Sequence, residues 1–238
     1  MAKSEKGFWN KEYASGGHLA LSTEPSGELV IFEKFFEREY GEGIFGYTNA
    51  VDIGCGNGRN LIHLAKTYGT KGVGFDSSDE GVRQAKKAGR ELKDISFVVH
   101  DIREPLPFPD ATFDLALDLM VSHHLTKEEH RHYMQEVLRV LKPDGWLLWK
   151  TFLLDDDIHS RKLIADSHKK GEVGKDDAHG YIHPNFGHYE YVWSEMELRE
   201  YVDEHFQVRA LRRSHGHKGD SGEERKRRYM VAYLERKN

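Results

Sequence analysis

The sequence predicts an α/β protein with a mostly parallel sheet and helices on both faces. Over the middle of the chain, short apolar segments alternate with segments of helical spacing. A glycine-rich loop, Val51-Asp-Ile-Gly-Cys-Gly-Asn-Gly58, joins the first apolar segment to the first helical one, and acidic residues recur where the next apolar segments end. Such alternation is typical of right-handed βαβ units, and short apolar strands are typical of a parallel sheet buried on both faces.

Length and composition bound the architecture. A chain of 238 residues can bury one good core, so residues 1–238 are expected to form a single domain. Hydrophobic residues make up 38% and charged residues 32%, and no apolar run approaches the roughly 18 residues of a membrane helix. Cys55 is the only cysteine, which excludes an internal disulfide. We therefore expect a cytoplasmic protein with no signal peptide and no membrane contact.

Two helices are expected before the glycine-rich loop, within residues 1–46. Residues 9–13 read as a short amphipathic helix that ends at Gly16-Gly17. Pro25 opens a second helix to about Tyr40, with apolar residues at helical spacing.

The alternation proper begins at the glycine-rich loop. The expected strands are residues 50–53, 72–75, 95–99, 113–119 and 146–152. The expected helices are residues 59–68, 79–88 and 127–141, the second of them capped by Ser78. Residues 142–145, Lys-Pro-Asp-Gly, are predicted to form a turn.

The last third of the chain departs from this rhythm. Residues 155–190 form a polar insertion, which we expect to be a short helix plus loops over the mouth of a site. Ser194 caps a helix to about His205, and residues 206–211 and 229–234 are two further strands. The segment from Gln207 to the end carries ten Lys/Arg and four Asp/Glu, and a basic segment of this kind suits an anionic substrate or RNA.

Three acids follow successive strands. Asp76 lies 18 residues after Gly58, where a carboxylate can accept hydrogen bonds from a ribose diol. Asp101 follows the next strand, where it can address an adenine amine, and Asp118 ends the strand after that. Each acid alone is more often a helix cap or a surface charge, but the joint pattern predicts a nucleotide-like ligand at one edge of the sheet.

At this point the chain resembles the class I S-adenosylmethionine-dependent methyltransferases, from about Ala50 to Phe152. Residues 51–58 are similar to the first motif of that family, and Gly74-Phe-Asp76-Ser-Ser to the second. His100-Asp101-Ile102 and residues 106–114 resemble the third and fourth, and residues 138–146 the helix-turn-strand motif that follows, with Asp144 where glycine is common. Residues 8–13, Phe-Trp-Asn-Lys-Glu-Tyr, resemble the N-terminal lid helix of the small-molecule branches.

The resemblance implies a fold and a set of cofactor contacts. It implies a Rossmann-like, seven-stranded, mostly parallel sheet whose last strand is antiparallel, with residues 1–46 as lid helices. It implies S-adenosyl-L-methionine as cofactor and S-adenosyl-L-homocysteine as product. The residues it assigns to the cofactor are Asp52, Gly54, Cys55, Gly56, Asn57, Gly58, Asp76, Ser77, Asp101, Ile102, Asp118 and Leu119.

Residues that would act on the methyl acceptor are less sharply indicated. His123 and His124, just past the fourth strand, are candidates for a general base or for plain packing. Candidates for substrate contact are Trp9, Tyr13, His18, His183, His188 and Tyr189. The insertion histidines match no zinc spacing and lack cysteine partners, so no metal is expected. Cys55 could be a nucleophile, but a small residue in a tight turn explains it better.

Three functions remain open on sequence grounds. The first is methyl transfer by in-line displacement to a small-molecule acceptor. The second is a tRNA-modifying methyltransferase that uses the basic C-terminal segment, and the third is a catalytically silent cofactor-binding protein. The Gly-x-Gly-x-Gly spacing disfavours a nicotinamide oxidoreductase, whose fingerprint is Gly-x-Gly-x-x-Gly. The oligomeric state is not indicated.

Overall fold

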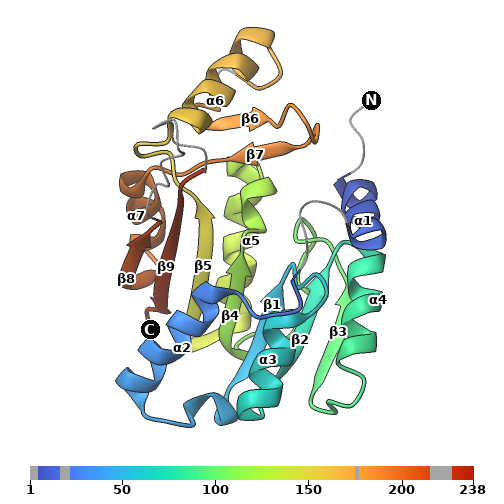
Figure 1. The fold of residues 1–238 in the computed structure, drawn as a ribbon. Coiled ribbons are helices and arrows are strands. Elements are labelled where there is room, and N and C mark those ends of the chain that lie inside the picture. Colours follow the sequence, from blue (N-terminus) through green and yellow to red (C-terminus); the bar gives the residue numbers. More distant parts are fainter. Residues whose placement is uncertain (1–4, 17–21, 175–176, 215–226) are drawn as a thin grey trace, which may run out of the picture.

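The computed structural model describes residues 5–16, 22–174, 177–214 and 227–238. Its centre is a seven-stranded sheet with the order β3-β2-β1-β4-β5-β9-β8 (Figure 1). The strands are β1 (Asn49–Ile53), β2 (Lys71–Asp76), β3 (Ile95–Val99), β4 (Phe113–Leu119), β5 (Leu141–Phe152), β8 (Phe206–Arg213) and β9 (Tyr229–Arg236). Neighbours from β3 to β5 pair in parallel, whereas β9 runs antiparallel to both β5 and β8. The mostly parallel sheet with an antiparallel last strand is therefore confirmed.

Helices cover both faces of this sheet. On one face lie α2 (Gly27–Tyr40), α3 (Arg59–Tyr68) and α4 (Asp79–Ala88), and on the other lie α5 (Lys127–Val140) and α7 (Glu195–Asp203). Successive strand residues point to opposite faces. Ala50 accordingly packs with the core of α2, α3 and α4, whereas Val51 packs with the core of α5 and α7. Burial on both faces holds for β1 and β4 but not for β3, an edge strand that leaves Val98 and Val99 exposed.

Capping residues set where several helices begin. Ser78 accepts a hydrogen bond from the Gly81 amide at the start of α4. Thr126 and Glu129 form a reciprocal capping box at the start of α5, and Ser194 caps α7. These caps fix the points at which the loops end and the helices begin.

The N-terminal region differs from expectation in length. The first helix, α1 (Glu5–Ser15), extends beyond the predicted residues 9–13 at both ends. None of its residues is buried, so contact with the core imposes no apolar periodicity on this helix. Its ends therefore could not be predicted from the sequence. A 3₁₀ turn, η1 (Ile44–Tyr47), was not predicted. Residues 17–21, with the predicted site residue His18, lie outside the described residues.

The predicted turn at residues 142–145 lies within β5. Phe113 pairs with Leu141 and Leu115 pairs with Trp146, so residues 142–145 bulge out of the register with β4. Asp144 takes a left-handed φ of 60° there. The strand therefore begins at Leu141, five residues before the predicted start.

The prediction of a short helix plus loops for the insertion is wrong in part. Residues 158–170 form α6 (Ile158–Lys170), a helix of 13 residues. A two-stranded hairpin follows, β6 (Gly180–Ile182) and β7 (Tyr189–Tyr191), which lies beside α6 at one end of the main sheet (Figure 1). Strands of three residues are too short to show an alternating pattern in the sequence, which explains the error.

Candidate functional site

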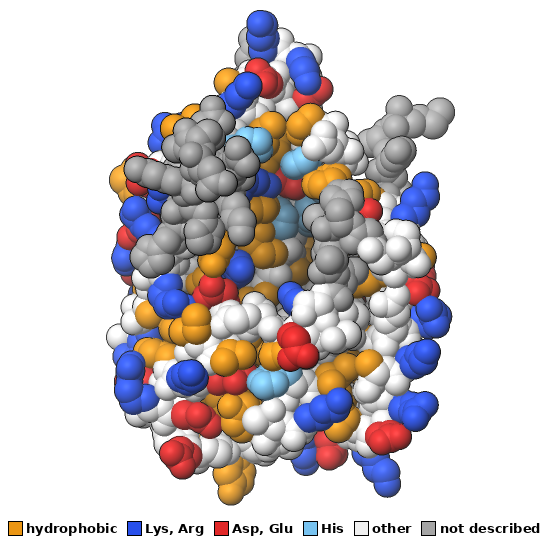
Figure 2. Space-filling model, viewed as in Figure 1, with side chains coloured by type: hydrophobic (Ala, Val, Ile, Leu, Met, Phe, Trp, Pro, Cys, Tyr) orange, Lys and Arg blue, Asp and Glu red, His pale blue; other side chains and the backbone are white. Residues whose placement is uncertain are grey.

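A cavity of about 460 Å³ opens at the carboxyl ends of β1, β2 and β4. The chain moves outward from β1 to β3 and then crosses to β4 on the other side of β1, so the cavity lies where the strand order reverses. Such a switch point is where open α/β sheets bind their ligands. Figure 2 shows the hollow, with hydrophobic and histidine side chains on its floor.

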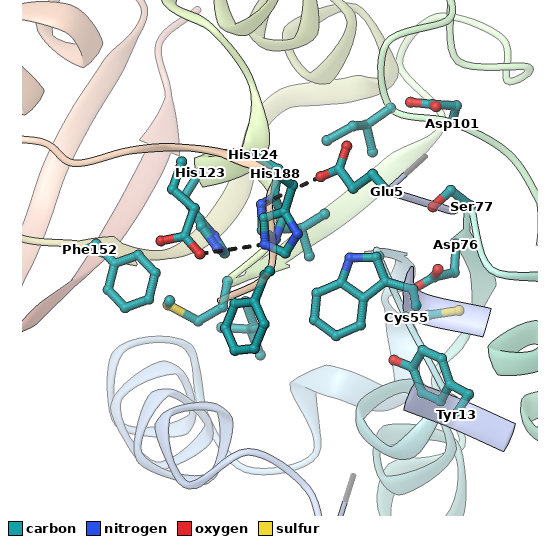
Figure 3. A pocket seen from close by; sticks show the side chains of 18 of the residues that line it. Glu5, Tyr13, Cys55, Asp76, Ser77, Asp101, His123, His124, Phe152 and His188 are labelled. Atoms are coloured by element: carbon teal, nitrogen blue, oxygen red, sulfur yellow. Dashed lines mark ion pairs between the residues drawn. The ribbon is translucent and has the colours of Figure 1, made fainter. Parts of the chain in front are cut away.

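Parts of the chain that are far apart in sequence contribute to the cavity. Its lining residues are Glu5, Trp9, Tyr13, Gly54, Cys55, Asn57, Arg59, Asn60, Asp76, Ser77, Asp101, Ile102, Arg103, Leu119, Met120, Val121, His123, His124, Phe152, His183, Phe186, His188, Glu190 and Arg227. Figure 3 shows two ends: Tyr13, Cys55, Asp76, Ser77 and Asp101 at one, and His123, His124, His188 and Phe152 at the other. We call the first the strand-loop end and the second the histidine end.

The glycine-rich loop presents bare backbone at the strand-loop end. Gly54 and Gly56 have φ values of 62° and 55°, which side chains other than glycine rarely adopt. A Cβ at Gly54 would lie 2.3 Å from Val121 Cγ2, and one at Gly56 would lie 2.1 Å from Tyr13 Oη. The loop therefore excludes side chains at both positions, because Val121 and Tyr13 pack directly on its backbone, and Gly54 lines the cavity without a side chain.

Asp76 is held rigidly beside this loop. Its Oδ2 accepts a hydrogen bond from the Gly56 amide at 2.9 Å, and its Oδ1 accepts one from the Ser78 amide at 2.8 Å. Burial raises the pKa of the carboxyl group, and these two amides oppose that shift. Each oxygen keeps a second acceptor position, so the carboxylate can still receive hydroxyl groups.

Asp101 and Ile102 line the outer edge of the same end. Asp101 Oδ1 accepts from the Arg103 amide at 2.9 Å. Arg103 also donates to Glu5 Oε2 at 2.7 Å and to Glu129 Oε1 at 3.2 Å. One guanidinium thus fastens α1 over the loop that follows β3.

Five of the predicted site residues lie outside the lining of the cavity: Asp52, Gly56, Gly58, Asp118 and Tyr189. A Cβ at Gly58 would meet Phe97 and Ala85, so Gly58 allows α3 and the sheet to pack closely. Tyr189 donates its hydroxyl hydrogen bond to Asp177 at 2.7 Å, inside the insertion.

The two buried acids under the strand ends have different surroundings. The Asp118 carboxylate faces the interior, where it accepts from the Tyr133 hydroxyl at 2.9 Å and the Val121 amide at 3.1 Å. Asp52 is only 1% exposed, and its Oδ2 lacks a hydrogen-bond partner among the described residues. Burial raises the pKa of Asp52 to about 7, although Leu61 and Asn60 donate hydrogen bonds to it.

Cys55 lines the cavity but is unsuited to nucleophilic chemistry. Its side chain is buried, and burial raises the pKa of its thiol well above the ordinary value. A thiol reacts as the thiolate, so this environment favours the alternative of a small residue in a tight turn.

The histidine end gathers buried polar groups. His123, His124 and His188 are each less than 8% exposed. Burial lowers the pKa of both His123 and His124, so both rings are neutral near pH 7. Glu190 Oε1 lies 3.6 Å from His188 Nε2, and Glu190 Oε2 accepts from Arg227 Nη1 at 2.6 Å.

Donor atoms of His123, His124 and Glu190 lie within 4.8 Å of one another. Histidine spacing in the insertion did not indicate this group, because two of its members lie just past β4. Elsewhere in the insertion, His168 and His179 bond to Asp177 and Glu197 and do not line the cavity.

Sequence reasoning missed Glu5, Phe186, Glu190 and Arg227. Glu190 and Phe186 belong to the unpredicted hairpin. Arg227 lies in the basic C-terminal segment, where a run of basic residues usually indicates a solvent-exposed loop. The Arg227 guanidinium instead stacks 3.2 Å from the centroid of the Phe152 ring. Only the Tyr181-to-Tyr189 segment, rich in aromatic and histidine residues, offered a signal for this region.

Comparison with known proteins gives a consistent result. Residues 50–145 match the family model described as a methyltransferase domain. The chain is 33% identical over 127 residues to 27-O-demethylrifamycin SV methyltransferase of Amycolatopsis mediterranei, covering 52% of this chain and 45% of that protein. It is 39% identical over 99 residues to norajmaline N-methyltransferase of Rauvolfia serpentina, covering 40% of this chain and 32% of that protein. The matched segment thus spans less than half the length of these curated relatives.

A solved structure supports the same fold over nearly the whole chain. The 1,6-didemethyltoxoflavin-N1-methyltransferase of Burkholderia thailandensis, solved with 1,6-didemethyltoxoflavin and S-adenosylhomocysteine bound, has a TM-score of 0.69 at 16% identity. The alignment covers 98% of this chain and 87% of that one. Within the described residues, none of the helices combines the length and apolarity needed to cross a membrane.

Proposed function

Because the chain carries a class I S-adenosylmethionine-dependent methyltransferase domain, we propose that it transfers a methyl group to a small-molecule acceptor. The observation that carries this proposal is the bare glycine backbone beside the fixed Asp76 carboxylate, at the switch point of the sheet. S-Adenosylmethionine supplies an activated methyl group on a sulfonium. The chain's own residues then need to hold the cofactor, orient the acceptor and shield the reacting groups from water.

The strand-loop end fits the cofactor. We assign the amino-carboxylate end to the backbone around Gly54, and the ribose hydroxyls to Asp76. Asp101 and Ile102 suit the adenine, and Leu119 suits the methionyl chain. Asp52 and Asp118 support the pocket from outside its lining. Asp118 fixes the Val121 backbone, and Asp52 lies under the glycine-rich loop.

The remaining wall shields the reacting groups from water. Helix α1 places Trp9 and Tyr13 over the cavity, and Asn10 Oδ1 accepts from Ser78 Oγ at 2.8 Å to hold the helix in place. Phe8 packs against Phe186 of the hairpin, with ring centroids 5.2 Å apart. Helix α1 and the β6–β7 hairpin thereby form one cover over the cavity, which we call the roof. Alignment of two reactants in such a site contributes up to roughly 7–11 kcal/mol in favourable cases.

The size and shape of the cavity favour a small acceptor. About 460 Å³ is in the range of ordinary small-molecule pockets, and the cofactor fills much of it. His123, His124 and His188 form the wall opposite the glycine-rich loop, so the acceptor lies against imidazoles and the Phe152 ring. The relatives named above are, by their names, methyltransferases of 27-O-demethylrifamycin SV and of norajmaline, which supports a small-molecule acceptor here.

Calorimetry with S-adenosylhomocysteine is the first test. We expect binding of one molecule per chain, and no protection of the protein by NAD in a melting assay. Fractionated metabolite pools with a labelled methyl donor then reveal the acceptor as the fraction that takes up label. Absence of S-adenosylhomocysteine binding contradicts the proposal. Binding without label transfer to any fraction supports the catalytically silent alternative instead.

A tRNA acceptor is the second candidate from the sequence, and the described residues do not favour it. Arg227 of the basic cluster is directed to Glu190 inside the cavity and does not extend a phosphate-binding surface. Phosphate contacts release counterions, so an RNA acceptor predicts turnover that falls steeply between 50 and 200 mM salt. Label transfer to RNA fractions with that salt dependence would replace the small-molecule proposal.

A further inference from the structure

Three buried side chains at the histidine end converge without bonding to one another. His123 and His124 lie in η2 (Ser122–His124), the turn after β4, and Glu190 lies in β7. One donor atom from each lies within 4.8 Å of the other two. The imidazole of His188 packs edge to face against His124, with ring centroids 4.7 Å apart, and so lies beside this group.

Two oxygen acceptors on one side of the ring orient His124. Its Nδ1 lies 3.2 Å from the Tyr189 carbonyl oxygen and 3.4 Å from Glu5 Oε1. In a neutral ring, an Nδ1 that faces acceptors carries the hydrogen, so Nε2 keeps its lone pair. A ligating histidine is usually fixed in this manner by a carbonyl or carboxylate at its other nitrogen.

Glu190 is fixed in a comparable manner. Its Oε2 accepts from both the Tyr181 hydroxyl and Arg227, while its Oε1 faces His188. One oxygen of the carboxylate is therefore anchored by the Arg227 ion pair, and the other is turned to the imidazoles.

Several nitrogen atoms here lack any hydrogen-bond partner. His124 Nε2, His123 Nδ1 and His188 Nδ1 are buried, and none has a partner among the described residues. Unsatisfied buried nitrogens are costly, and three of them within one cluster indicate a missing ligand. An imidazole nitrogen that carries no hydrogen offers a lone pair, and the Glu190 carboxylate offers a charge.

We propose that His123, His124 and Glu190, with His188 beside them, bind one divalent transition-metal ion. Two imidazoles and one carboxylate suit iron, zinc, cobalt or nickel and leave positions open for another ligand. Donors around a tetrahedral ion with bonds of about 2.1 Å lie roughly 3.4 Å apart, so small side-chain rotations close the cluster. Arg227 remains on the outer oxygen of Glu190, where it fixes the carboxylate as an outer-sphere partner.

The site also specifies an acceptor class, and this step rests on the proposed function. The open positions would face the cavity, because His123, His124, His188 and Glu190 all line it. An acceptor that presents an oxygen donor can then ligate the ion, which orients that atom and lowers its pKa, while the oxygen keeps a lone pair for the methyl group. Phenols and hydroxy acids fit this description, whereas purely apolar acceptors do not.

Metal binding by the full-length chain is the test, with Zn²⁺ in equilibrium dialysis and Co²⁺ in visible absorption. We expect one ion per chain and a zinc absorption-edge spectrum that contains imidazole at about 2.0–2.1 Å. His124→Gln and Glu190→Gln should each weaken binding at least about 10-fold. His132→Gln, an exposed histidine on α5, is the matched control and should bind as the wild type does.

Circular dichroism and S-adenosylhomocysteine affinity establish that each variant is folded. If Glu190→Gln unfolds because Arg227 loses its partner, the metal affinity of His123→Gln and the wild-type edge spectrum test the site instead. Wild-type protein that binds no ion, or variants that bind as tightly as His132→Gln, overturn the metal site. S-Adenosylhomocysteine binding is measured in the same samples. Loss of metal binding alone leaves the proposed function intact, and loss of cofactor binding alone leaves the metal site intact.

Discussion

The strand-loop end and the histidine end of the cavity are built from the chain in different ways. The strand-loop end draws most of its residues from 54–103, on the loops after three neighbouring strands. The histidine end combines the turn after β4, the end of β5, the hairpin and Arg227. The first end is therefore specified by local motifs, and the second depends on how distant segments pack. The predictions below test this contrast.

The largest expected effect concerns Asp52, under the strand-loop end. Its folded pKa of about 7 lies above the ordinary value of 3.8, so the folded state binds more protons between these values. Stability therefore falls as pH rises from about 4 to 7 and is constant above. Each pKa unit corresponds to about 1.4 kcal/mol, which gives a loss of roughly 3 kcal/mol between pH 5 and pH 8. Asp52→Asn should lack this loss, as measured by urea unfolding at both pH values; parallel pH profiles would contradict it.

Gly54→Ala should weaken S-adenosylhomocysteine binding at least about 100-fold, or roughly 2.7 kcal/mol. The new Cβ meets Val121 at 2.3 Å, in a left-handed backbone that disfavours alanine. Gly171→Ala is a matched control, because Gly171 has a φ of 69° but open space around it. Calorimetry of both variants separates the clash in the site from backbone strain. Equal affinities in the two would remove the glycine loop from the cofactor site.

Asp76→Asn should weaken S-adenosylhomocysteine binding roughly 10- to 100-fold, because charge-assisted hydrogen bonds of about 1.5–3 kcal/mol become neutral ones. Asparagine keeps an acceptor for only one of the two backbone amides, and its NH2 group faces the other, so the loss includes this broken contact. Asp101→Asn, at a side chain that is 44% exposed, should cost only a few-fold. A larger loss at Asp101 than at Asp76 would reverse the roles assigned to them.

Most of the strand-loop end could be predicted from the sequence. Strand β4 and helix α3 have the predicted bounds, because alternating apolar segments, caps and glycines act over a few residues. A position at the end of a strand, however, does not by itself bring a side chain into the site, because side chains alternate between the two faces of the sheet. Asp118 was expected beside Asp76 and Asp101 at the site, yet its carboxylate faces Tyr133 in the interior.

The histidine end was only partly predictable. His183 and His188 were candidates because residues 181–189 lie where the resembling family places substrate-reading insertions. Glu190 and Arg227, by contrast, acquire their importance through an ion pair that spans 37 residues of chain. Three-residue strands leave no periodic signal, so the hairpin that carries Glu190 was not foreseen. Contacts between distant segments depend on tertiary packing, which local pattern does not encode.

The smallest expected effect concerns the roof that joins the two ends. Phe8 contacts Phe186 and His188 with ring centroids 5.2 and 5.1 Å apart, and α1 has no buried residue of its own. Aromatic pairs contribute about 0.5–1.5 kcal/mol each, and two pairs at the low end give about 1 kcal/mol, so Phe8→Ala should speed hydrogen exchange of the residue 5–15 amides about 5-fold.

Met196→Ala is the control, because Met196 is a large exposed apolar residue away from the cavity lining. It should leave exchange in α1 unchanged. Asn10 and Arg103 still hold α1 to the strand-loop end in the Phe8 variant, so S-adenosylhomocysteine affinity should change less than exchange does. If exchange in residues 5–15 stays at the wild-type rate, α1 is held by the strand-loop end alone and the roof is not shared with the hairpin.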